Sequence, residues 1–211
     1  MKPGAVPWRG GQVVLGILLA AILVLPVTVI AIGIGSLAEQ YDVALSTWVS
    51  VHIMGLGIIG VVWGIGIHRY KAPLSTLGLA PLGLPGVKAV FLTLGALVAS
   101  LLATVVYARL MSLIDSNVLS PPDIPSDIAF PGAAAAFTFQ ALAVVTPVTE
   151  EIFFRGFVFS GLRARLGAGW AMVASAAVFS LFHLSVGVLI PVFITGLLLA
   201  WLYRRTGSLW P

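Results

Sequence analysis

The sequence predicts an all-α protein: a polytopic bundle of transmembrane helices with about six spans, forming a single membrane-embedded domain over residues 1–211. Composition is the first reason, because 60% of the residues are hydrophobic and 9% are charged, far outside the range of soluble globular domains. The second reason is that the charges lie between apolar runs, as topology signals do. The net charge of +4 is therefore no indication of a nucleic-acid partner. The sequence contains no cysteine, which excludes disulfides, thiol nucleophiles and cysteine metal ligands.

The apolar runs define the predicted spans. They lie at about residues 12–36, 45–67, 87–113, 132–163, 170–186 and 188–203. The first run is too long for a removable signal peptide and lacks a convincing small-residue cleavage site, so we expect it to remain as an anchor. Pro26 within it is tolerated in a membrane helix as a kink. In the second run, Gly60 and Gly64 have the small-xxx-small spacing that favours close helix packing.

Charged residues predict which side of the membrane each connection faces. Lys2 and Arg9 precede the first span, and further basic residues occupy the connections at 68–88, 163–169 and 204–206. The acidic residues outside the spans fall in the other connections: Glu39, Asp42, Asp115, Asp123 and Asp127. Because short cytoplasmic loops are enriched in Lys and Arg, we expect a multi-pass integral membrane protein with a cytoplasmic N-terminus.

Three ionisable residues, Glu150, Glu151 and Arg155, lie within the fourth apolar run. Each charge near the middle of a membrane helix costs about 2.5–3.5 kcal/mol, so such residues usually face a bundle interior and serve a function. On a helix, Glu151 and Arg155 share a face and predict an ion pair, whereas Glu150 points about 100° away. The spacing therefore indicates one structural ion pair beside one available carboxylate.

A histidine follows in the next predicted span. Phe179 and His183 are four residues apart and share one face of that helix. Glu150 and His183 are nearly equidistant from the basic, glycine-bearing turn at 163–169, which predicts that they lie at one depth in an antiparallel hairpin. A buried carboxylate and a buried imidazole at one depth can form an acid–base pair.

Other polar residues in the spans are expected to be structural. His52 and His68 lack a carboxylate partner, and Gln140 is placed to hydrogen-bond a neighbouring helix. A His-Glu-x-x-His zinc motif is absent, every Asp lies in a predicted loop, and no Gly-x-Ser-Gly arrangement occurs. The sequence therefore lacks these three motifs, and Glu150 and His183 remain as the candidate acid–base pair.

The two motifs, Glu150-Glu151-x-x-x-Arg155 and Phe179-x-x-x-His183, resemble those of the CAAX prenyl protease and bacteriocin-processing family, also called the abortive-infection family. Its members are intramembrane endopeptidases and relatives, and the type II CAAX prenyl proteases are the nearest in pattern. The resemblance covers about the last third of the chain. It divides the domain into variable helices at about 12–113 and a family core at about 132–211.

The run at residues 76–79, Thr-Leu-Gly-Leu, also resembles a spacer of that family. In the family, a turn similar to Thr206-Gly207-Ser208-Leu209 leads into another helix with a further His and an Asn. Neither residue follows here, so we expect the core to be incomplete at its C-terminus: either the chain is a fragment, which its abrupt end at Trp210-Pro211 favours, or the protein lacks part of the family's site.

The resemblance implies an intramembrane endopeptidase that hydrolyses a peptide bond of a membrane-associated or lipid-modified polypeptide. Glu150 and His183 would be catalytic by activating a water, and Glu151, Arg155 and Phe179 would support them. The partners implied are membrane lipid and a membrane-associated or lipidated peptide substrate, with no nucleic acid. No cofactor is expected.

Two alternatives remain open. Glu150 and His183 also supply N and O ligands for a divalent metal such as zinc, which would make the chain a metal-dependent protease, although no convincing third ligand comes from a separate helix. The alternative from a different class is a non-catalytic membrane protein, such as a bacteriocin-immunity factor or partner-binding scaffold that retains the motifs.

Overall fold

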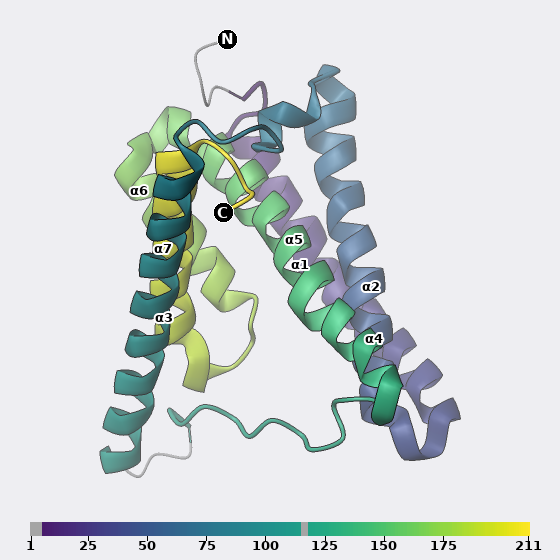
Figure 1. The fold of residues 1–211 in the computed structure, drawn as a ribbon. Coiled ribbons are helices and arrows are strands. Elements are labelled where there is room, and N and C mark those ends of the chain that lie inside the picture. The colour runs from purple at the N-terminus through teal and green to yellow at the C-terminus, as the bar shows by residue number, and fades with distance from the viewer. Residues whose placement is uncertain (1–5, 115–117) are drawn as a thin grey trace.

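The computed structural model describes residues 6–114 and 118–211, so that Lys2 and Asp115 of the topology prediction lie outside the described residues. Across these two ranges the chain is helical and has no strand, which confirms the predicted all-α class. The α-helices are α1 (Gly10–Gly35), α2 (Asp42–Val62), α3 (Gly86–Ile114), α4 (Ala135–Phe139), α5 (Thr146–Glu151), α6 (Ser160–Leu181) and α7 (Leu189–Thr206). Figure 1 shows them as a bundle in which α3 lies beside α7, apart from α4 and α5.

Three π-helical segments continue the α-helices without a break. Trp63–His68 extends α2, Gln140–Val145 links α4 to α5, and Ile152–Phe159 links α5 to α6. Such wide turns are rare in proteins and frequently occur at functional sites. Glu150 and Glu151 are the last two residues of α5, and π-helical segments flank this short helix on both sides.

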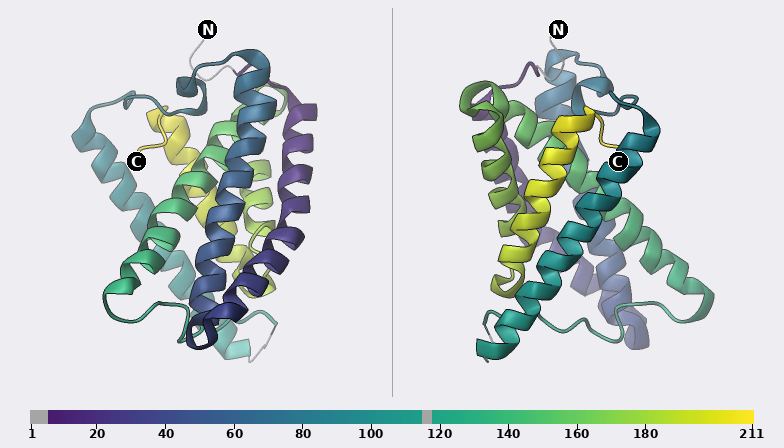
Figure 2. Two further views of the ribbon diagram at one scale, coloured as in Figure 1. Left: turned by 90° about the vertical axis from the view of Figure 1, so that its right-hand side faces the viewer. Right: turned by 60° about the vertical axis from the view of Figure 1, so that its left-hand side comes forward.

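The predicted count of six spans is not confirmed. Within residues 6–114 and 118–211, four continuous helical stretches are long and apolar enough to cross a membrane: Gly10–His68, Gly86–Ile114, Gly132–Leu181 and Val186–Thr206. Two of these stretches contain a residue with non-helical backbone angles, Glu39 at φ 45° and Gly167 at φ 73°. The first stretch turns back at Glu39, since α1 packs along α2 (Figure 2).

The fifth predicted span is wrong at its C-terminal end. It was expected to reach residue 186, but α6 ends at Leu181, and His183 lies in the connection to α7. The chain leaves the helix here because Leu184 has a positive φ of 50°, and the Phe179 carbonyl, which a continuing helix would offer to the His183 N–H, takes a side-chain contact. The ring Nδ1 of His183 lies 3.0 Å from this carbonyl, and the His183 N–H donates instead to Ser180 at 3.1 Å.

The outer surface of the bundle is apolar. Leu25, Leu56 and Phe91 are each more than 70% exposed, and they lie on α1, α2 and α3 respectively. Exposed apolar surface of this extent marks contact with a membrane or another apolar partner. With the four spanning stretches, it indicates an integral membrane protein.

Glycines bring the helices into contact in the core. A Cβ added at Gly16 of α1 would lie 2.5 Å from the buried Phe157 ring, and one added at Gly161 of α6 would lie 2.4 Å from an α1 side chain. At Gly60 and Gly64 an added Cβ would meet nothing within 4 Å. The close packing suggested by their small-xxx-small spacing is therefore not found, because these two glycines face away from the helices that α2 contacts.

The two ends of the bundle differ in charge. In Figure 1, α1 begins and α2 and α7 end at the same end of the molecule. Basic residues gather there, including Arg69, Lys71 and Arg204, whereas the acidic turn around Glu39 lies at the opposite end. Arg109, near the far end of α3, is an exception. This separation accords with the alternation on which the topology prediction rests, and the cytoplasmic N-terminus stays a prediction.

Candidate active site

Glu151 and Arg155 form the ion pair that their spacing predicted. Arg155 Nη1 lies 2.8 Å from Glu151 Oε1. The arginine is fully buried, donates from Nη2 to the Gly196 carbonyl of α7 at 3.3 Å, and lies 4.5 Å from the centre of the Phe179 ring. A guanidinium over an aromatic face gains a cation–π attraction. Arg155 thus ties the end of α5 to both α6 and α7.

Two serines of α6 hold the π-helical segment that carries Arg155. Ser160 Oγ donates to the Arg155 carbonyl at 3.0 Å, and Ser175 Oγ donates to the Phe154 carbonyl at 2.8 Å. Both hydroxyls are buried, so each bond also satisfies a polar group of the side chain. Ser160 at the start of α6 and Ser175 in the half after Gly167 therefore both fix the backbone on which the ion pair stands.

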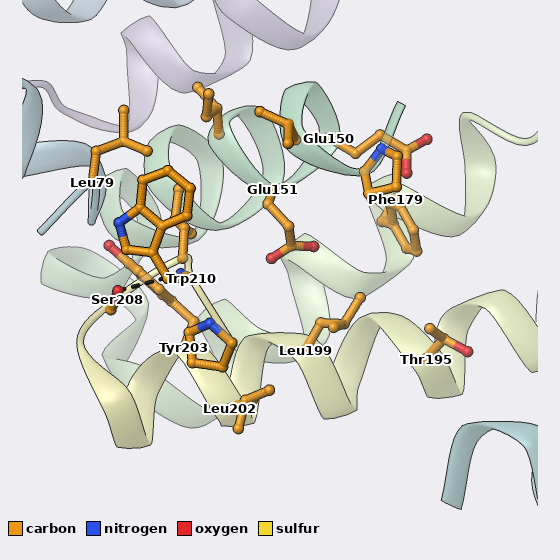
Figure 3. A pocket seen from close by; sticks show the side chains of 15 residues that line it. Leu79, Glu150, Glu151, Phe179, Thr195, Leu199, Leu202, Tyr203, Ser208 and Trp210 are labelled. Atoms are coloured by element: carbon orange, nitrogen blue, oxygen red, sulfur yellow. Dashed lines mark hydrogen bonds between the residues drawn. The ribbon is translucent and has the colours of Figure 1, made fainter. Parts of the chain in front are cut away.

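Glu150 lies next to this pair and takes no part in it. Within residues 6–114 and 118–211, no hydrogen bond or ion pair involves its carboxylate. Glu150 is partly buried and lines two cavities, one against α7 and one against α1 and α2. Figure 3 shows it beside Phe179 at the edge of the cavity against α7, with Glu151 nearer the centre of the view. This placement leaves the carboxylate available.

The prediction of a buried imidazole is wrong for His183, which is exposed and lines neither of the two cavities that Glu150 lines; it reaches the ion pair only through Phe179. The His183 and Phe179 rings meet edge to face, with centroids 4.9 Å apart. The Phe179 ring in turn contacts the guanidinium of Arg155. No hydrogen bond joins His183 to Glu150 in the described structure. Since a carbonyl only accepts, the bond to Phe179 makes Nδ1 the protonated nitrogen of a neutral ring and leaves Nε2 as an acceptor.

The cavity between α5 and α7 has a volume of about 460 Å³; we call it the α5–α7 cavity. Its walls include Leu79, Glu150, Glu151, Leu199, Tyr203 and Trp210. Apolar walls with a few convergent polar groups are the usual form of ligand sites in proteins. Both carboxylates of the motif face this single space.

Tyr203 is a cavity residue that the sequence did not suggest. Its ring packs edge-on against Phe159, and its hydroxyl lies 3.4 Å from Ser160 Oγ. It stands in the last turn of a predicted span beside Arg204, where tyrosines are common for reasons of membrane-interface chemistry alone. No sequence signal therefore separates this Tyr from an anchor residue.

The connection after α2 also reaches the cavity, through Leu79. It comes this close because Gly78, at φ 85°, passes over Tyr203, where an added Cβ would lie 2.4 Å from the ring. Gly156 makes a similar approach, since a Cβ there would lie 2.7 Å from the Leu77 carbonyl oxygen. The sequence shows where these glycines are, but it does not show which segment each of them contacts.

Three hydrogen bonds hold this connection against the chain that follows α7. Gly83 N–H donates to Thr206 at 2.8 Å, Leu209 N–H donates to Gly78 at 2.9 Å, and Ser208 Oγ donates to Ala80 at 2.8 Å. We call them the 78–83 clasp. They connect a segment near the middle of the sequence to residues 206–209.

Gln140 makes the bond to a neighbouring helix that was predicted for it. Its Nε2 lies 3.1 Å from His52 Nε2 on α2, while His52 Nδ1 lies 2.7 Å from the Trp48 carbonyl. With Nδ1 donating to that carbonyl, Nε2 accepts from the Gln140 amide. The predicted structural role of His52 agrees with this pairing.

Metal ligation was the alternative use of Glu150 and His183. Among the residues that the structure describes, no three His, Asp or Glu side chains converge as a metal-binding group. Glu151, the nearest further carboxylate in sequence, is paired with Arg155. The side chains therefore offer a metal at most a partial set of ligands, compared with the three protein ligands of catalytic zinc sites.

Comparison with known proteins identifies the second part of the chain. Residues 132–211 match the family model described as type II CAAX prenyl endopeptidase, Rce1-like. This segment is similar to the type II CAAX prenyl endopeptidases. The matched segment runs from just before α4 to beyond α7 and contains Glu150, Glu151, Arg155, Phe179 and His183, which confirms the family resemblance. The similarity supports a CAAX-type intramembrane peptidase. No curated protein and no solved structure matches the chain.

Proposed function

We propose that the chain is an intramembrane endopeptidase that hydrolyses a peptide bond of a membrane-associated or lipid-modified polypeptide, with Glu150 as the general base. The observation that carries this proposal is the contrast between two adjacent carboxylates. Glu151 is held by Arg155 at 2.8 Å, whereas Glu150 has no such partner among the described residues and lines the α5–α7 cavity. A carboxylate without an ion-pair partner is energetically costly inside an apolar helix bundle, and such residues usually have a functional role.

In this mechanism Glu150 takes a proton from a water molecule, and the resulting hydroxide attacks the peptide carbonyl. The carbonyl becomes a tetrahedral oxyanion, and the proton held by Glu150 then passes to the departing amine. His183 assists through Nε2, which the bond of Nδ1 to Phe179 leaves as an acceptor. By family resemblance, donors for the oxyanion are a His and an Asn of a further helix.

The α5–α7 cavity is the proposed substrate site. Its apolar walls, including Leu79, Leu199 and Leu202, suit the apolar side chains or the lipid group of a membrane-bound peptide. The ion pair of Glu151 with Arg155 adds no net charge to this space. A substrate with an acidic residue next to the scissile bond would meet the Glu150 carboxylate and be disfavoured.

The test is peptide cleavage by purified full-length protein in nanodiscs. Two peptides of one sequence, one prenylated and one not, report on the substrate class. Glu150→Gln keeps the shape of the side chain but cannot take a proton, so cleavage should fall by about 10²–10⁴-fold with normal folding. Glu39→Gln, an exposed residue of the 36–41 turn, is the matched control. Full activity of Glu150→Gln would overturn the proposal.

Two further results distinguish the alternatives. Complete loss of cleavage with a strong chelator, restored by added metal, would replace the glutamate mechanism by a metal-dependent one. Saturable binding of the peptide with no cleavage by the parent protein would favour the non-catalytic scaffold.

A further inference from the structure

A second cavity meets Glu150 from the side opposite α7. It has a volume of about 260 Å³ and lies where α1, α2 and α5 meet; we call it the α1–α2 cavity. Its walls include Thr28, Ser50, Met54, Thr146, Thr149 and Glu150. Glu150 lines both cavities, whereas Glu151 lines only the α5–α7 cavity.

Four residues with side-chain hydroxyls line the α1–α2 cavity, and each hydroxyl donates to a backbone carbonyl of its own helical stretch. Thr28 donates to Val24, Ser50 to Thr47, Thr146 to Ala141 and Thr149 to Val145, at 2.8–3.0 Å. A hydroxyl that has donated its proton keeps two lone pairs, so each oxygen remains able to accept a hydrogen bond. Water molecules can donate to these oxygens and to the Glu150 carboxylate.

The size and charge of this cavity fit water. At about 30 Å³ for each molecule in the liquid, the space holds several waters, and a buried water needs two to four polar partners. Buried polar groups without a protein partner are normally hydrated, and the Glu150 carboxylate is such a group in the described structure. Glu150 is the single charged residue in the cavity wall.

We propose that the α1–α2 cavity holds the water that Glu150 activates. The inference rests on the proposed function, because it assigns the α5–α7 cavity to the substrate. A peptide that fills that cavity displaces water from it, so the hydrolytic water must reach Glu150 from another side. The α1–α2 cavity meets the same carboxylate and leaves the substrate space undisturbed.

The absence of cysteine from the sequence makes the water content directly measurable. Single cysteines are introduced as Ser50→Cys and Thr146→Cys in the cavity, and as Leu56→Cys on the lipid-facing surface of α2, where Leu56 is 74% exposed. Protein in nanodiscs is treated with a charged methanethiosulfonate, which reacts with thiols in water. We expect both cavity thiols to react at least tenfold faster than Leu56→Cys. Equal rates would show a dry cavity and overturn the proposal.

A cavity-filling variant tests delivery of water to the reaction. Ser50→Leu should slow labelling of Thr146→Cys and lower kcat for peptide cleavage, while KM stays unchanged because the α5–α7 cavity is untouched. Ser112→Leu on the exposed surface of α3 is the matched control. Unchanged kcat in Ser50→Leu would overturn the role of the cavity. Fast labelling of Ser50→Cys and Thr146→Cys, together with no peptide cleavage by the cysteine-free parent protein, would instead overturn the protease function and leave the hydrated cavity standing.

Discussion

Glu151→Gln should be the most destabilising single change in the ion pair, more so than Arg155→Met. The reason is an asymmetry in burial, since the Arg155 side chain is 1% exposed and that of Glu151 is 21% exposed. Glu151→Gln leaves a cation with no counter-charge in the core, and breaking a buried pair in this way costs about 3–5 kcal/mol. Arg155→Met leaves a carboxylate at the edge of the α5–α7 cavity, where water can reach it, so the cost should be smaller.

A double-mutant cycle gives the sharpest measurement. Thermal unfolding of purified protein in detergent should show a fall in Tm of roughly 6–20 °C for Glu151→Gln, from about 2–4 °C per kcal/mol at this chain length. The double variant Glu151→Gln, Arg155→Met should lie close to Arg155→Met alone, because no buried charge is then unpaired. Glu39→Gln should unfold as the parent does. Additive losses in the double variant would refute the reasoning.

Three further predictions follow from the fold and the site. A cysteine placed at Lys71 should resist impermeant thiol reagents in intact cells if the basic end of the bundle is cytoplasmic, and external labelling would reverse the topology. His183→Ala should slow cleavage by about 10²–10⁴-fold, and the double variant with Glu150→Gln should lose little more, because residues that act on one water are not additive. Gly156→Ala should cost about 1–3 kcal/mol of stability, since its Cβ would lie 2.7 Å from a backbone oxygen, whereas Gly60→Ala, with nothing within 4 Å, should be neutral or slightly stabilising; similar Tm values for the two variants would contradict this.

Local spacing predicted the parts of the site that a single helix determines. Four-residue separation was enough to pair Glu151 with Arg155, because both stand on one continuous helical run. The position of His183 was not predictable in this way. The helix ends before His183, at a turn in which Leu184 has a positive φ, whereas the hydropathy of the sequence shows only that the surrounding residues are apolar.

Contacts between different helices were the second feature that the sequence did not predict. The spacing of Gly60 and Gly64 satisfied a packing pattern, but the close contacts occur at other glycines, Gly16 and Gly161 among them. Which face of a helix meets a neighbour depends on how the whole bundle assembles. For the same reason the sequence did not predict that Tyr203 and Leu79 line the cavity, since this depends on how α7 packs against the connection after α2.

The 78–83 clasp has a consequence for biosynthesis. Ala80 and Ser208 are 128 residues apart in sequence, so translation at about 5–20 residues per second separates their emergence by roughly 6–26 s. During that interval the ribosome has delivered Glu150 to the membrane, yet the wall segment that carries Leu79 has no partner to hold it. The wall of the α5–α7 cavity is therefore completed only after Ser208 has emerged, and the nascent chain carries Glu150 in the membrane before the cavity around it is closed.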